Sequence, residues 1–259
     1  MINSVCLILF AVLVVSLQIH NTILLVIWGI FSVLLYAFSD KRLRMFIATQ
    51  AVFGAGFLLY FYAITNWVPE VQTTEIHIFL NRLSLIFVVI PLLMLSLFLH
   101  RPFMIYWRKP AWKETIAFPF IWSGFHRVSI ARFLAIALAA NLAVFVPFLY
   151  RSGWSGIGEI WLLAIIFSLT NALLEELIWR GVLLSRFAEG MGEKWAVALT
   201  SVGFGLQHFS LGFPWLACLA FSVGGLFFGG ITVRSRSILP AMAWHLVLNL
   251  LMVLSGFVM

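Results

Sequence analysis

The chain has 259 residues, of which 63% are hydrophobic and only 10% are charged. Because about a quarter of the residues of a soluble domain are charged, this composition excludes a soluble globular protein and predicts an all-α, polytopic membrane protein. The net charge of +7 would also suit a protein that binds nucleic acid, so the placement of the basic residues decides between these classes.

Apolar runs of about 20 residues, the length that crosses a hydrocarbon core of about 30 Å, predict a bundle of about nine transmembrane helices. The first run lacks a basic n-region and a small-residue cleavage site, so we expect a retained helix there and not a signal peptide. In chain order the predicted spans lie near residues 2–18, 22–39, 45–65, 83–99, 129–149, 160–184, 195–211, 216–233 and 238–257.

The basic residues alternate between the two sides of the predicted bundle. Of the 16 Lys and Arg residues, all except Arg82 and Arg151 follow even-numbered spans. This positive-inside pattern predicts a cytoplasmic N-terminus and an exterior C-terminus. We therefore expect the lipid bilayer and its anionic headgroups as partners, and no nucleic acid. Nothing in the sequence indicates a eukaryotic context, so the expected location is a prokaryotic plasma membrane.

The longest polar connection runs from His100 to about Val128 and contains "RPFMIYWRKPAWKETIAFPF". Its aromatic and cationic residues are typical of a segment that lies in the cytoplasmic membrane interface. We expect it to divide the chain into an N-terminal four-helix region, residues 1–128, and a C-terminal core, residues 129–259. Ionisable residues within the predicted spans concentrate in the core.

Three short polar motifs fall inside these C-terminal spans. An ionised group at the bilayer centre costs about 2.5 to 3.5 kcal/mol on insertion scales, so such residues are usually paired and functional. At 1.5 Å per residue, their depths from helix ends near residues 184, 195 and 238 come to about 10 to 20 Å, which predicts one shared layer. The motifs are "EELIWR" with Glu175, Glu176 and Arg180, "FGLQH" with His208, and "HLVLN" with His245 and Asn249.

The two adjacent glutamates are expected to have different roles, because neighbouring positions on a helix point about 100° apart. Glu176 can pair with Arg180 at i+4, which leaves Glu175 as the unpaired carboxylate. Glu175 with His208 could activate water as a general base. His245 and Asn249 could then donate hydrogen bonds to the oxyanion of a tetrahedral intermediate, so the set favours peptide-bond hydrolysis.

Other interpretations of these residues stay open. A membrane histidine often only joins two helices, and a Glu-Arg pair at i, i+4 can be a structural clasp. A transporter or immunity scaffold could use the same polar groups, and Glu175, His208 and His245 could form a His₂Glu zinc site. A diaspartyl protease is excluded because the chain has one aspartate, Asp40. A zinc protease of the H-E-x-x-H type is excluded because no two histidines have that spacing.

In these motifs the sequence resembles the CPBP family of intramembrane proteases, which includes type II CAAX prenyl endopeptidases and bacterial proteins linked to bacteriocin self-immunity. The family pattern E-E-x-x-x-R, F-x-x-x-H and H-x-x-x-N occurs here in family order. The resemblance implies a glutamate-dependent endopeptidase without a metal cofactor, acting on a membrane protein or a lipid-anchored peptide. It implies that Glu175, His208, His245 and Asn249 are catalytic, with Glu176, Arg180 and Phe204 in support.

Overall fold

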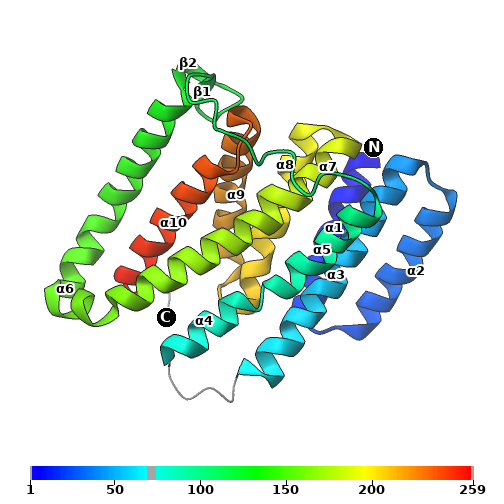
Figure 1. Cartoon of the computed structure of the whole chain (residues 1–259), viewed down its shortest axis with the longest axis horizontal. Helices are drawn as coiled ribbons and strands as arrows, with labels where there is room; N and C mark the ends of the chain where they lie inside the picture. Colours follow the sequence, from blue (N-terminus) through cyan, green and yellow to red (C-terminus); the bar gives the residue numbers. More distant parts are fainter. Residues whose placement is uncertain (1, 69–73, 258–259) are drawn as a thin grey trace.

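Helices make up almost the whole fold, which confirms the predicted all-α class (Figure 1). The computed structural model of the chain describes residues 2–68 and 74–257. The first half contains α1 (Ile2–Gln18), α2 (Thr22–Phe38), α3 (Lys41–Asn66), α4 (Thr74–Leu83) and α5 (Ile86–Phe98). The second half contains α6 (Ile130–Glu176), the π-helix η2 (Leu177–Leu183), α7 (Leu184–Met191), α8 (Glu193–Leu206), the 3₁₀-helix η3 (Gln207–Leu211), α9 (Trp215–Ser235) and α10 (Leu239–Leu254).

Each of the nine predicted spans overlaps a helix, but two of them are joined. Helix α6 turns at Gly153, whose φ of 69° lies in the left-handed region that glycine adopts without a steric penalty. The turn separates two rods, Ile130–Arg151 and Gly156–Met191. The second rod continues through η2 and α7, so it does not end near residue 184 as the depth argument assumed.

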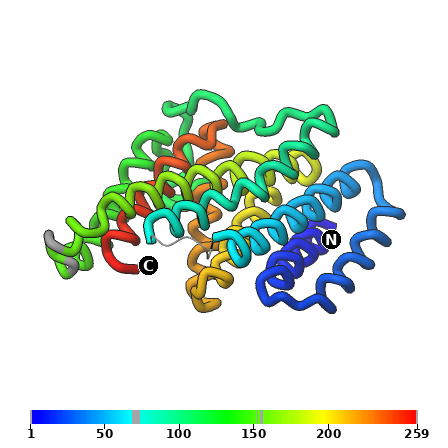
Figure 2. The backbone as a smooth tube through the Cα atoms, turned by 60° about the horizontal axis from the view of Figure 1, so that its bottom comes forward, coloured from blue at the N-terminus to red at the C-terminus, as the bar shows by residue number. Residues whose placement is uncertain are grey.

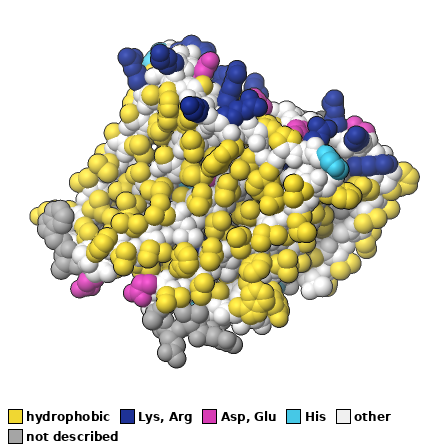
Figure 3. Space-filling view, viewed as in Figure 1, with side chains coloured by type: hydrophobic (Ala, Val, Ile, Leu, Met, Phe, Trp, Pro, Cys, Tyr) yellow, Lys and Arg dark blue, Asp and Glu magenta, His cyan; other side chains and the backbone are white. Residues whose placement is uncertain are grey.

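The lengths and surfaces of the helices suit a membrane. Hydrophobic side chains cover much of the flank of the molecule in Figure 3, and on α2 the exposed fractions of Ile23 and Phe38 reach 73% and 89%. Such surface is stable against lipid and not against water. The helices long and apolar enough to cross a membrane are Lys41–Asn66, Thr74–Phe98, Ile130–Arg151, Gly156–Met191 and Trp215–Ser235, and α1, α2 and α10 are shorter apolar helices.

The charged side chains are segregated along the helix direction. In Figure 3 the Lys and Arg side chains gather at the top, the end where Figure 1 places the N-terminus and the hairpin β1–β2. We call this the basic end. Helix α4 and the C-terminal end of α10 lie toward the opposite end (Figures 1 and 2).

The connection between α5 and α6 contains a two-stranded hairpin that the sequence analysis did not predict. Strand β1 (Thr115–Pro119) pairs antiparallel with β2 (Gly124–Ser129), and Thr115 faces Ser129. Buried Ile116 and Ile121 anchor the hairpin, each with an exposed fraction of 1% or less. The hairpin lies at the basic end of the molecule, and the interfacial location of the connection stays a prediction.

The two halves of the chain pack against each other. Helix α1 contacts α8, α3 contacts α7, and α4 contacts α6. Within the second half, α8 and α9 approach each other closely at Gly205, where an added Cβ would lie 1.9 Å from Ser222 Oγ. Small residues permit such close contact between membrane helices. The division at residue 128 stays a prediction.

Candidate active site

The adjacent glutamates lie where α6 changes into a π-helix. Glu175 and Glu176 are the last residues of α6, and η2 begins at Leu177. Their exposed fractions are 2% and 0%. A π-helical turn is rare and occurs frequently at functional sites. The local geometry therefore marks this position independently of the sequence motif.

Glu176 and Arg180 form the ion pair that their spacing predicts. Arg180 Nη1 donates to Glu176 Oε1 at 2.8 Å, and neither side chain is exposed. The guanidinium carbon lies 4.2 Å from the ring centroid of Phe204 and 5.1 Å from that of Phe228. Both aromatic faces stabilise the cation. The negative charge of Glu176 is thus matched, while Glu175 has no arginine or lysine partner among the described residues.

His245 lies between the two carboxylates. Its Nδ1 is 2.8 Å from Glu176 Oε1, and its Nε2 is 3.6 Å from Glu175 Oε2. An ionised carboxylate can only accept, so the contact with Glu176 assigns a ring hydrogen to Nδ1. Nε2 therefore faces Glu175. This arrangement brings a residue predicted to bind the oxyanion next to the predicted general base.

His208 is held by its own helix. Its Nδ1 lies 2.7 Å from the carbonyl oxygen of Phe204, and its ring stacks on Phe221 with centroids 4.1 Å apart. A carbonyl oxygen only accepts, so in the neutral ring Nδ1 carries the hydrogen and Nε2 is an acceptor. Within the described part of the chain, His208 forms neither a hydrogen bond nor an ion pair with Glu175. Their predicted cooperation must act through a bound water.

A cavity of about 250 Å³ adjoins these groups, and the two glutamates are not among its lining residues. His208, His245 and Asn249 line it, and its remaining wall is mainly apolar. Several buried polar atoms at the site have no hydrogen-bond partner in the described structure, and they include Asn249 Nδ2 and Glu175 Oε2. A free donor and a free acceptor in a buried site are available to water or substrate. Phe204 packs between the histidines, with ring centroids 5.0 Å from His208 and 5.6 Å from His245.

Three polar residues at the site were missed by the sequence analysis. Gln207 Nε2 donates to Glu175 Oε1 at 3.2 Å. Arg82 Nη1 donates to Asn171 Oδ1 at 3.3 Å, and both line the cavity. Signals for them existed, since Gln207 directly precedes His208 in a predicted span and Arg82 breaks the alternation of basic residues.

The possible metal ligands are not gathered into one cluster. Among the described residues, no group of three or more His, Cys, Asp or Glu side chains is arranged to hold a metal ion. This includes Glu175, His208 and His245, the set that the sequence analysis considered for zinc. His245 and Glu175 approach each other, but His208 points its Nδ1 at a backbone carbonyl.

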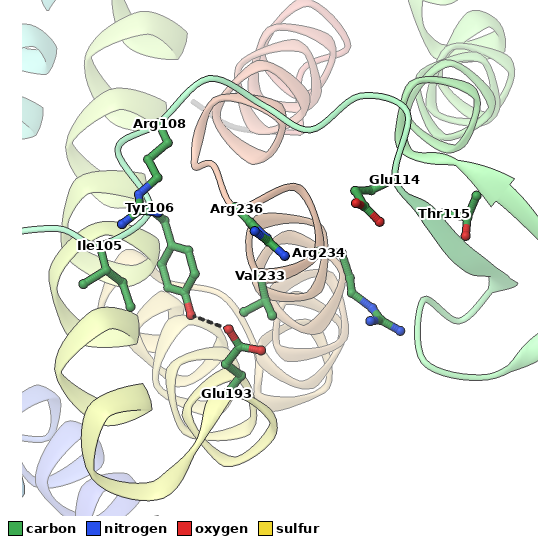
Figure 4. Close-up of a pocket in the computed structure, with 9 residues that line it drawn as sticks. All are labelled: Ile105, Tyr106, Arg108, Glu114, Thr115, Glu193, Val233, Arg234 and Arg236. Carbon is green, nitrogen blue, oxygen red and sulfur yellow. Dashed lines mark hydrogen bonds between the residues drawn. The ribbon is translucent and has the colours of Figure 1, made fainter.

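A second cavity, of about 420 Å³, lies at the basic end and has a different character (Figure 4). Tyr106 donates to Glu193 at 3.2 Å across its wall. Its lining is largely charged and includes no histidine. The charged residues are Arg108, Glu114, Glu193, Arg234 and Arg236. Three arginines there suit contact with anionic lipid headgroups.

Comparison with known proteins agrees with the motif pattern. Residues 156–251 match the family model of type II CAAX prenyl endopeptidase Rce1-like proteins. No curated protein and no solved structure matches the chain. The matched segment runs from the second rod of α6 into α10 and contains all three motifs. This segment of the chain is therefore similar to Rce1-like type II CAAX prenyl endopeptidases, in agreement with the resemblance of its motifs to the CPBP family.

Proposed function

We propose that the protein is an intramembrane glutamic-type endopeptidase that hydrolyses a peptide bond of a membrane protein or a lipid-anchored peptide. The Rce1-like match supports a membrane protease of the CAAX type. One observation carries the finer assignment: of two adjacent buried glutamates, Glu176 is matched by Arg180, while Glu175 has no arginine or lysine partner among the described residues and faces His245 Nε2. A carboxylate in this position is suited to take a proton from water.

The first step is the activation of water by Glu175. The Gln207 amide holds Glu175 Oε1, which leaves Oε2 to accept the proton of a water molecule. In its neutral form, His208 can accept a second hydrogen bond from this water at Nε2 and so orient it. The hydroxide attacks the carbonyl carbon of the scissile bond. When the C–N bond breaks, Glu175 returns the proton to the leaving amine, so the carboxylate is regenerated.

The second requirement is stabilisation of the oxyanion. Asn249 Nδ2 has no partner among the described residues and can donate to the developing charge. His245 can donate from Nε2 when both of its ring nitrogens carry hydrogen, because Nδ1 is engaged by Glu176. Each such donor typically contributes about 100- to 1,000-fold in rate. No step requires a metal, and independence from metal is a prediction of the proposal.

We also infer the orientation in the membrane. Lys and Arg side chains gather at one end of the molecule, and such clusters face the cytoplasm in membrane proteins. This distribution supports a cytoplasmic N-terminus and an exterior C-terminus. A prokaryotic plasma membrane is the proposed location.

The test compares the native host carrying the wild-type protein or the Glu175→Gln variant. New peptide ends in the membrane and secreted fractions are identified by proteomics. We expect specific precursors to accumulate with Glu175→Gln, with cleavage reduced at least about 100-fold, the lower range for loss of a general base. EDTA added to isolated membranes should leave cleavage unchanged, whereas inhibition that zinc reverses would favour a zinc-dependent protease.

Glu159→Gln is the matched control. Glu159 is exposed on the same helix as Glu175, and the substitution removes the same charge. It should process precursors as the wild type does, and membrane insertion of both variants is checked by fractionation. If the peptide ends match between wild type and Glu175→Gln while deletion of the gene changes the host, Glu175 is not catalytic. A transporter or immunity scaffold would then explain the polar groups.

A further inference from the structure

Arg82 is a cation in the catalytic cavity that comes from outside the segment matching the family. It belongs to α4, whereas the family match begins at residue 156. Arg82 lines the same cavity as His208, His245 and Asn249. The mechanism proposed above gives this arginine no role.

The contacts of Arg82 hold its position but do not match its charge. Its guanidinium donates to the neutral Asn171 amide oxygen and lies 5.4 Å from the ring centroid of Phe167. Among the described residues, Arg82 forms no ion pair with any carboxylate. An arginine within a membrane-spanning helix normally has a charged partner or lines a functional pathway. Arg82 can therefore accept an anion without first losing an internal salt bridge.

A larger cavity on the other side of Arg82 provides a route to it. This cavity has a volume of about 630 Å³ and shares Arg82, Phe167, Leu211 and Phe213 with the catalytic cavity. Its outer wall includes Thr74, the first residue of α4. It therefore opens toward the end of the molecule opposite the basic end, where Figure 1 places α4. Arg82 stands where the two cavities meet.

We propose that Arg82 binds a carboxylate of the substrate and so selects substrates that carry this group near the scissile bond. The inference rests on the proposed peptidase function and names a specificity residue for it. A guanidinium binds a carboxylate through two parallel hydrogen bonds, which gives both affinity and orientation. The carboxylate can be the free C-terminus of the substrate or an acidic side chain.

The position of Arg82 also limits the distance between this carboxylate and the scissile bond. Asn171, which Arg82 contacts, precedes Glu175 by four residues in α6, a rise of about 6 Å. An extended peptide advances about 3.3 to 3.6 Å per residue. The selected carboxylate thus lies within about three residues of the bond that Glu175 attacks.

The test measures binding and not hydrolysis, so it can be decided separately from the peptidase function. The full chain is reconstituted in nanodiscs with the Glu175→Gln substitution, which prevents turnover. The first probe pair is the peptide acetyl-Leu-Phe-Leu-Phe-Leu with a free C-terminal carboxylate or with a C-terminal amide. The second pair has the amide end and carries either Glu or Gln in place of the fourth residue. Affinities are measured by titration calorimetry with Arg82 intact, with Arg82→Gln and with Arg82→Lys.

With Arg82 intact, we expect the carboxylate member of at least one pair to bind about 10- to 100-fold more tightly than its neutral counterpart, the usual range for a hydrogen bond to a charged group. The pair that discriminates identifies the source of the carboxylate. Arg82→Gln should abolish the difference, while Arg82→Lys should retain part of it. Arg151→Gln, which removes an exposed arginine before the turn of α6, should leave it unchanged.

The proposal is overturned if the protein with Arg82 intact prefers the carboxylate in neither pair, or if Arg82→Gln keeps the preference. Each result is the ratio of two peptide affinities measured on the same protein preparation. A partial loss of folded protein affects both measurements equally, so it does not change this ratio. A carboxylate preference that depends on Arg82 would stand even if Glu175→Gln had no effect on processing in the host. In that case the peptidase function, and not the binding site, would be rejected.

Discussion

Replacing Glu176 with Gln should destabilise the protein far more than the same change at Glu175, although the residues are adjacent. Glu176 Oε1 accepts from both Arg180 Nη1 and His245 Nδ1, each at 2.8 Å. The Glu176→Gln variant removes the negative charge and leaves the Arg180 guanidinium buried without a counter-ion. Arg180 Nε and Nη2 already lack hydrogen-bond partners among the described residues.

The expected loss in unfolding free energy is about 3 to 5 kcal/mol, the range for removing one partner of a buried ion pair. The aromatic faces of Phe204 and Phe228 stay in place and continue to stabilise the cation by about 2 kcal/mol, which offsets only part of this loss. Removing both charges, with Glu176→Gln and Arg180→Met together, leaves no buried cation. The double variant should therefore be more stable than Glu176→Gln alone, because no charge is left buried without a partner.

The assay is denaturant unfolding of the purified protein in detergent micelles, followed by tryptophan fluorescence. Exposed Glu159 gives the control, since Glu159→Gln should change the unfolding free energy by less than about 0.5 kcal/mol. A loss below about 1 kcal/mol for Glu176→Gln would refute the reasoning. So would additive effects of the two substitutions, because residues in direct contact should couple by about 0.5 to 3 kcal/mol.

Two further predictions concern Gln207 and the contact between α8 and α9. Gln207→Leu removes the donor to Glu175 Oε1 and should slow precursor cleavage about 10- to 100-fold; an unchanged rate in a pulse-chase experiment would show that the amide does not position the carboxylate. Gly205→Ala places a Cβ 2.4 Å from the Cys218 carbonyl oxygen and should lower the unfolding free energy by about 1 to 3 kcal/mol. Gly224→Ala has no atom within 4 Å of its Cβ, so equal losses for the two alanine variants would contradict this account.

Most of the helices could be predicted from the sequence because apolar runs of sufficient length cross a membrane. Helix α4 (Thr74–Leu83) was missed, since the nearest predicted span began at residue 83. The turn at Gly153 could not, since two adjacent apolar runs look the same whether a loop or a sharp bend joins them. The hairpin β1–β2 was missed for a different reason. Its strands are short, and it is stabilised by burial of Ile116 and Ile121 against other segments, which no local pattern reports.

Motif spacing predicted which polar residues lie in the core but not how they contact one another. The Glu176–Arg180 pair follows from the i, i+4 geometry of one helix. The position of His245 between Glu175 and Glu176 depends on the rotation of α10 relative to α6, which the sequence does not specify. The contact of Gln207 with Glu175 could not be predicted for the same reason. Gln207 and His208 are adjacent, and the rotation of their helix decides which of the two side chains reaches Glu175.

The first half of the chain contributes to the site as well as to the membrane anchor. Gln18, at the end of α1, donates to the carbonyl oxygen of Leu206 at 2.9 Å and accepts from the backbone N–H of Ser210 at 2.8 Å. These two contacts bracket η3, the short helix that carries Gln207 and His208. Backbone groups at the end of a helix need such partners when they are buried. Because α1 holds η3 and α4 supplies Arg82, two of the contacts that shape the cavity come from outside the segment that matches the family.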